Sequence, residues 1–218
     1  METTADSPSL VLPVDPEHNA LRLSVIAILV ASFVIAFNIF NRLIPGEGIN
    51  FIAGILAFAA GVVVTWLSER FLKGRWPSGR TVAIQGDKIQ IRSKDVVQQE
   101  INADQHVNVL CWRFKIKRGS RMKGWFVVAC ALEQDSNYLA VYTFMSSEQV
   151  NAPEVASRFK MLLPTKDSDK DLRLAGEQRR LRSAEEHRWM HGAEMSNQDF
   201  ETYITHLQRR FSRWMSAN

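Results

Sequence analysis

Two long uncharged stretches near the N-terminus constrain this chain more than any other feature. The first, LSVIAILVASFVIAFNIFN, lies between Arg22 and Arg42, and the second, GINFIAGILAFAAGVVVTWLS, lies between Glu47 and Glu69. At a helical rise of about 1.5 Å per residue, each stretch is long enough to cross the ~30 Å hydrocarbon layer of a bilayer. The sequence therefore predicts a pair of transmembrane helices within residues 21–72.

Two other interpretations of these stretches fit the sequence less well. A pair of buried core helices in a soluble protein is disfavoured because both stretches lack a polar stripe. A cleaved signal peptide begins with a basic segment, whereas residues 1–21 include four acidic side chains and no Lys or Arg. We expect residues 1–20 to form a disordered tail.

The connection between the stretches, RLIPGEG, is short and rich in turn-forming Pro and Gly. It predicts an antiparallel helical hairpin. Small residues spaced by four favour close approach of helix backbones. They are Ala27 and Ala31 in the first stretch, and Ala53, Ala57 and Gly61 in the second. This spacing does not distinguish packing within one chain from packing between two chains.

The segment WLSERFLKGRWPSGR, which follows the second stretch, predicts the orientation of the hairpin. It carries four basic residues, whereas the connection between the helices carries only Arg42. Because basic residues mark the cytoplasmic side, we expect both termini in the cytoplasm and a multi-pass protein of the cell (inner) membrane. The alternative is a solvated linker. The predicted membrane-interface anchors are Trp66, Arg70, Lys73, Arg75 and Trp76.

From residue 78 to residue 163 the pattern predicts a β-rich domain. Val82 and Ile84 precede a Gly-Asp turn, and Ile89 and Ile91 follow it, which is typical of a β-hairpin. Residues 110–117 alternate between an apolar face and a basic face that we expect to be solvated. Two further apolar strands follow. Helical spacing in EVASRFKMLL then predicts a closing helix, which gives an α+β domain with five to seven strands.

The order of these elements resembles the bacterial pleckstrin-homology-like (PH-like) membrane proteins. The residues that carry the resemblance are the membrane hairpin, TVAIQGDKIQIRS, EINADQHVNVLCWRFKI, WFVVACALE and YLAVYTFM. The resemblance implies an antiparallel PH-like sheet or barrel closed by a helix, and a scaffold or binding module rather than an enzyme. It implies no particular ligand. The basic turn KRGSRMKGW and the last fifty or so residues depart from the family pattern.

A basic window in this domain is the strongest candidate for a binding site. Between Asp104 and Glu133 there are six basic residues and no acidic ones: Arg113, Lys115, Lys117, Arg118, Arg121 and Lys123. Such a patch suits anionic lipid headgroups or an acidic protein partner. A solvated sheet face that resists edge-to-edge association is the third interpretation. The net charge of +4 is too small to favour nucleic acid.

Residues 164–218 predict a polar linker and a helical tail. A weakly striped helix is predicted to end at Gly192, and Ser196 with Asp199 resembles a capping box for a second helix. The apolar stripe of that second helix is formed by Phe200, Tyr203, Ile204, Leu207, Phe211 and Trp214. It suits packing on the chain's own domain, docking on a protein partner or self-association, or contact with the membrane.

No motif in the sequence names a reaction or a cofactor. His187 and His191 have a spacing that metals can use, but HRWMH lacks the general-base glutamate of an H-E-x-x-H motif. Cys111 and Cys130 are expected to be buried free thiols. We therefore expect a non-catalytic membrane-anchored binding or assembly module, for instance an accessory subunit of a membrane complex. The alternatives are a metal-dependent enzyme that uses the two histidines, or a signal-relay protein switched through its C-terminal helices.

Overall fold

A computed structural model describes residues 10–16, 19–44, 50–117, 122–164 and 172–214 of the chain. The chain forms two compact units, a helical hairpin of residues 16–78 and a folded domain of residues 1–15 with residues 79–218. The expected separation into a β-rich domain that ends at residue 163 and a helical tail is therefore wrong. Strands and helices from both segments share one core.

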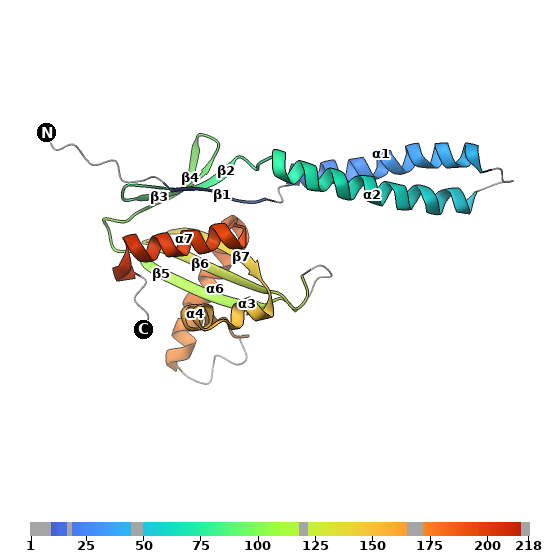
Figure 1. Cartoon of the computed structure of the whole chain (residues 1–218). Helices are drawn as coiled ribbons and strands as arrows, with labels where there is room; N and C mark the ends of the chain where they lie inside the picture. The colour runs from blue at the N-terminus through green and yellow to red at the C-terminus, as the bar shows by residue number, and fades with distance from the viewer. Residues whose placement is uncertain (1–9, 17–18, 45–49, 118–121, 165–171, 215–218) are drawn as a thin grey trace. The chain divides into compact units, whose positions relative to one another are not determined.

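The helical hairpin consists of α1 (Asn19–Leu43) and α2 (Phe51–Arg75), which lie side by side (Figure 1). Both helices are long and apolar enough to cross a membrane by length and composition. Most of their large apolar side chains point outward, including those of Ile26, Val34 and Phe58. Ser32 and Thr65 donate their hydroxyls to backbone carbonyls one turn earlier in the same helix.

Small residues bring the two helices of the hairpin together, as the sequence predicts for α2. Ala53 and Ala57 are completely buried, and a Cβ atom at Gly61 would lie 3.5 Å from the backbone nitrogen of Phe33. The contact therefore lies within one chain. The prediction for α1 is wrong, because Ala27 and Ala31 are exposed. The neighbouring face of α1 makes the contact, where the Ser32 hydroxyl and the backbone of Phe33 lie against Gly61.

The first sheet of the folded domain has the strand order β1-β2-β3-β4 and is antiparallel. Its strands are β1 (Leu10–Pro13), β2 (Arg80–Gln85), β3 (Lys88–Ser93) and β4 (Val96–Asn102). The predicted hairpin is confirmed, since Val82 lies opposite Ile91 across the Gly86 turn. The expectation of a disordered tail is wrong at β1, because Leu12 pairs with Val82 and its side chain is buried.

The second sheet is mixed and has the order β8-β5-β6-β7-β9. It is formed by β5 (Asn108–Lys115), β6 (Phe126–Gln134), β7 (Asn137–Met145), β8 (Lys160–Met161) and β9 (Ala193–Glu194). Both faces are covered by protein. Along β6, Val128 and Cys130 face the main core with the first sheet, whereas Val127 and Ala129 face a smaller core with α6 (Leu172–His191).

The two sheets do not join into the closed barrel that the sequence led us to expect. The expected closing helix after Pro153 is also shorter than predicted. Two short helices, α3 (Ser147–Asn151) and α4 (Pro153–Arg158), are followed directly by β8. The helix that fills the main core is α7 (Asn197–Arg210), which begins at the predicted cap Ser196 and is followed by the short 3-10 helix η1 (Ser212–Trp214).

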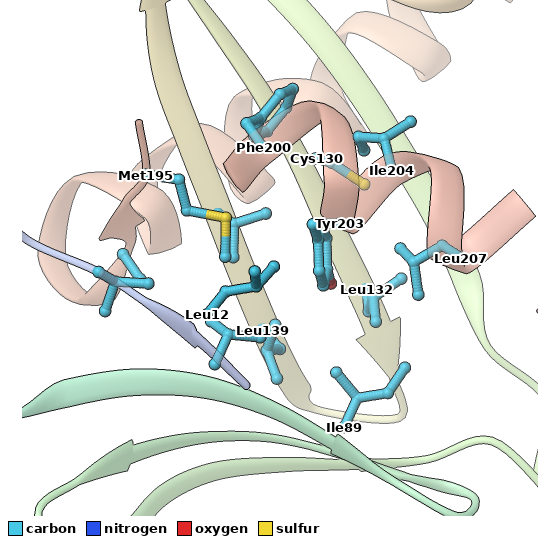
Figure 2. Close-up of a cluster of buried hydrophobic side chains, with 14 of the residues drawn as sticks. Leu12, Ile89, Cys130, Leu132, Leu139, Met195, Phe200, Tyr203, Ile204 and Leu207 are labelled. Carbon is cyan, nitrogen blue, oxygen red and sulfur yellow. The ribbon is translucent and has the colours of Figure 1, made fainter. Parts of the chain in front are cut away.

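The apolar stripe of α7 packs on the chain's own domain, which was one of the three interpretations of the sequence. Figure 2 shows Phe200, Tyr203, Ile204 and Leu207 beside residues of both sheets, among them Leu12, Ile89 and Leu139. Phe211 lies just past the helix and stacks on Trp214 with a centroid distance of 4.3 Å. The prediction that this stripe binds a partner protein is therefore wrong, because the stripe is buried in the chain's own core.

Candidate membrane-contact surface

The connection between β5 and β6 carries the exposed part of the predicted basic window. Lys115, Lys117 and Lys123 are all exposed, and Met122 and Trp125 are partly exposed beside them. The backbone nitrogen of Ile116 donates to the carbonyl of Trp125 at 2.8 Å, which extends the strand pair beyond β5 and β6. Arg118 and Arg121 lie outside the described residues. We call the described residues 115–117 and 122–125 together the basic hairpin.

Arg113 does not belong to this exposed surface, which corrects the sequence prediction. Its guanidinium donates to the carbonyl of Val150 at 2.6 Å, at the end of α3. The same face of β5 carries Cys111, which packs against the main core. Because core elements cover this face, it is not the solvated basic face that strand alternation suggested. The basic surface is therefore restricted to the end of the strand pair.

A cluster of polar contacts joins the two places where the hairpin of α1 and α2 is connected to the folded domain. Asp15 precedes the helical hairpin in the chain, Arg80 follows it, and the two side chains form an ion pair at 2.7 Å. The other oxygen of Asp15 accepts from the backbone nitrogen of Glu194 at 2.9 Å. Arg80 also donates to the carbonyls of His191 and Gly192. Sequence reasoning missed this cluster, although its signal was the opposite charges on either side of the apolar segment.

The C-terminal end of α6 lies between this junction cluster and the start of the basic hairpin. Arg188 is only 6 % exposed, and its guanidinium lies 4.5 Å from the ring centre of Tyr142 and 6.0 Å from that of Phe114. It also forms paired hydrogen bonds of 2.6 and 2.7 Å with Glu185. Burial and the nearby Glu194 carboxylate raise the pKa of Tyr142 to about 12. Phe114 directly precedes Lys115, so this contact ties α6 to the base of the basic hairpin.

The predicted interface anchors in the helical hairpin lie on the last turns of α2, except Trp76, which is its C-cap residue. Trp66, Arg70 and Trp76 are exposed. Lys73 pairs with Glu69 at 2.9 Å, and the Arg75 guanidinium lies 4.5 Å from the ring centre of Phe71. The helix continues to Arg75, three residues beyond the predicted boundary at residue 72. This arrangement sets aromatic and basic side chains around one end of α2.

The histidines and cysteines that the sequence analysis singled out make contacts within the folded domain. The His187 ring stacks on Tyr138 at 4.2 Å, and the backbone carbonyl of His191 accepts from Arg80. Within the described ranges, no three His, Cys, Asp or Glu side chains are grouped where they could hold a metal ion. Cys111 and Cys130 are free and lie opposite each other in register. A hydrogen bond with Cys111, together with burial, raises the pKa of the Cys130 thiol well above its ordinary value.

The comparisons with known proteins identify no relative of this chain. No family model matches the sequence, no curated protein is significantly similar to it, and no solved structure is significantly similar to its fold.

Proposed function

We propose that this chain is a membrane-anchored binding or assembly module without catalytic activity of its own. In this proposal α1 and α2 cross the cell membrane, both termini lie in the cytoplasm, and the folded domain serves as a PH-like scaffold. The basic hairpin contacts anionic lipid headgroups at the membrane surface. An accessory role in a larger membrane complex is compatible with these features.

The observation that carries the proposal is the exposure of apolar side chains along both helices of the helical hairpin. Two helices of membrane-spanning length that pack on each other through small residues leave most of their Ile, Val and Phe side chains outward. In water such a surface is unfavourable by about 25 cal/mol per Å², whereas lipid chains solvate it. The basic and aromatic end of α2 supports the cytoplasmic orientation.

The contact with anionic lipid rests on composition and exposure. Lys115, Lys117 and Lys123 place three cations on one exposed connection, beside the partly exposed Met122 and Trp125. Each cation near an anionic surface contributes about 1 kcal/mol, which screening by salt reduces. Trp and Met side chains suit the headgroup region, where an amphipathic or flexible apolar side chain finds favourable surroundings.

The test uses the full chain in nanodiscs, with an environment-sensitive fluorophore on Met122→Cys. We expect a blue shift when anionic lipid replaces neutral lipid, and a loss of that shift at high salt. Neutralising Lys115, Lys117 and Lys123 to Gln should abolish the shift. The matched control neutralises three other exposed basic residues, Lys88, Lys160 and Arg179, and should preserve it. The same emission spectrum in anionic and in neutral nanodiscs would contradict the contact with anionic lipid.

A further inference from the structure

The last turn of α6 presents an unusual run of outward side chains. Trp189 is 80 % exposed and Met190 is 64 % exposed, although both are large and apolar. His191, the last residue of the helix, is also exposed. Arg188 points the other way, into its contacts with Glu185 and Tyr142, and so fixes the rotation of this turn. Leaving a tryptophan in water at this position forgoes favourable burial, which marks the turn as a contact surface.

The chain connectivity around this turn indicates what covers it. Arg80 donates to the His191 carbonyl at 3.2 Å, and Asp15 accepts from the backbone nitrogen of Glu194. Arg80 and Asp15 are the domain residues that flank the apolar segment. Only residues 16–18 separate Asp15 from the start of α1, and only residues 76–79 separate the end of α2 from Arg80. At about 3.5 Å per extended residue, these two connections span at most about 14 Å and about 18 Å.

We propose that Trp189 and Met190 insert into the headgroup region of the bilayer and thereby orient the folded domain on the membrane surface. This inference rests on the proposed function, because it requires that α1 and α2 lie in the same bilayer. The chemistry fits, since a Trp side chain has an apolar body and a polar N–H that settle at the boundary between headgroups and acyl chains. Met adds a flexible apolar side chain beside it.

Two surfaces of the folded domain would then meet the lipid together. Phe114, which contacts Arg188 of the same helical turn, directly precedes the basic hairpin. The exposed turn of α6 supplies apolar insertion, and the basic hairpin supplies attraction to anionic headgroups. Two weak contacts of different kind on one domain restrict its tilt relative to the membrane plane more than either contact does alone. A second copy of this chain or another protein seated on Trp189 is the competing occupant.

The test measures lipid contact residue by residue in the full chain, reconstituted into liposomes that contain anionic lipid. A fluorophore is attached to Met190→Cys, and nitroxide-bearing lipids serve as quenchers. The matched control is Arg179→Cys, eleven residues earlier on α6. It lies on the same face of the helix but about 16 Å from position 190. The wild-type chain gives the background labelling, since Cys130 is buried and Cys111 is partly buried.

We expect nitroxides near the headgroups to quench the fluorophore at position 190, and to leave position 179 close to its value in nitroxide-free liposomes. Trp189→Ser should reduce the quenching at position 190, because the neighbouring anchor is removed. Equal quenching at positions 190 and 179 would overturn the inference. Quenching at position 190 by a labelled second copy, in place of lipid, would overturn it in favour of self-association.

A third position separates this inference from the proposed function. Phe58 is the eighth of the 25 residues of α2, about 10 Å along the helix, and is exposed. A fluorophore on Phe58→Cys should be quenched by nitroxides deep in the acyl chains if the helices cross the bilayer. Quenching at position 58 without quenching at position 190 overturns only the docking of α6. Absence of quenching at position 58 contradicts the membrane anchoring itself.

Discussion

The Arg80 guanidinium and the Asp15 carboxylate, 65 positions apart in the sequence, form an ion pair with a separation of 2.7 Å. Asp15 is the last residue of the folded domain before the helical hairpin, and Arg80 lies at the start of β2, where the chain returns to the domain. Because Asp15 also binds β9 and Arg80 also binds the end of α6, four segments of the domain meet at this pair. The pair therefore joins the two segments of the domain that precede and follow the helical hairpin in the chain.

Replacing Arg80 with Ala should lower the free energy of unfolding of the domain by about 1–2 kcal/mol. The reason is the loss of charge-assisted hydrogen bonds to a partly buried carboxylate and to two carbonyls. Denaturant titration of the full chain in mild detergent measures the change. The control is Lys88→Ala, whose pair with Glu100 is exposed and should contribute less than about 0.5 kcal/mol. Strict additivity of Asp15→Ala and Arg80→Ala in a double mutant would contradict direct coupling.

Replacing Gly192, which follows α6, or Gly176, which lies within α6, with alanine should change the stability of the domain in opposite directions. A Cβ atom on Gly192 would overlap the carbonyl oxygen of Arg188, so Gly192→Ala should cost about 1–3 kcal/mol. Gly176 lies within the same helix with open space around it, and Gly176→Ala should stabilise the helix by up to about 1 kcal/mol. Thermal unfolding followed by circular dichroism distinguishes the two. A stable Gly192→Ala variant would show that this turn relaxes freely.

The hydroxyl of Tyr203 is buried and finds no hydrogen-bond partner among the residues that the structure describes. Tyr203→Phe should therefore leave the free energy of unfolding unchanged or raise it by up to about 1 kcal/mol, since a desolvated hydroxyl is removed. Tyr203→Ala should lower it by about 3–5 kcal/mol, because a large core cavity results. Comparable losses in both variants would mean that the hydroxyl is hydrogen-bonded in solution.

Stability should depend on pH through Glu133. Burial alone would raise the pKa of this carboxyl group, but hydrogen bonds from Tyr138 and Arg180 outweigh it and lower the pKa below its ordinary value of 4.5. A group with a lowered folded-state pKa stabilises the fold above its unfolded-state pKa, and this contribution is lost as the pH falls through the folded-state value.

Glu133→Gln should therefore cost stability at neutral pH, and the difference from the wild type should shrink below about pH 4.5. Denaturant titrations of both chains across this range give the difference directly. Tyr138→Phe removes one of the three hydrogen bonds that the Glu133 carboxylate accepts from side chains, and should show part of the same pH dependence. A difference that stays constant down to the lowest pH would contradict the role assigned to this carboxylate.

Local sequence patterns predicted the helices and strands of this fold better than they predicted which distant segments pack against them. The pairing of Val82 with Ile91 and the cap at Ser196 follow from residues close in sequence. The partner of Arg113 is Val150, 37 positions away, and the strand that pairs with β1 begins only after the whole helical hairpin. The alternation of apolar and basic side chains along β5 correctly assigned them to two faces of the sheet. This alternation does not reveal that other parts of the protein cover both faces.

Because sequence patterns do not show which segments pack together, they predicted only some of the exposed residues in the candidate surfaces. Lys115, Lys117 and Lys123 are exposed, as predicted, because a strand connection projects its side chains into solvent whatever packs on the sheet. The stripe of α7 was ambiguous, since an apolar helix face fits its own core as well as a partner. Trp189 and Met190 gave no periodic signal at all. Their exposure, opposite the buried Arg188, is seen only in the structure.

The most direct test of the account is the topology of the chain in intact cells. Cysteines introduced at Gly48, between the two apolar helices, and at Gln198, exposed on α7, are treated with a membrane-impermeant maleimide. The account predicts that position 48 is labelled in intact cells and that position 198 is labelled only after the membrane is permeabilised. Labelling of position 198 in intact cells, or release of the whole chain from membranes by alkaline carbonate, would contradict it.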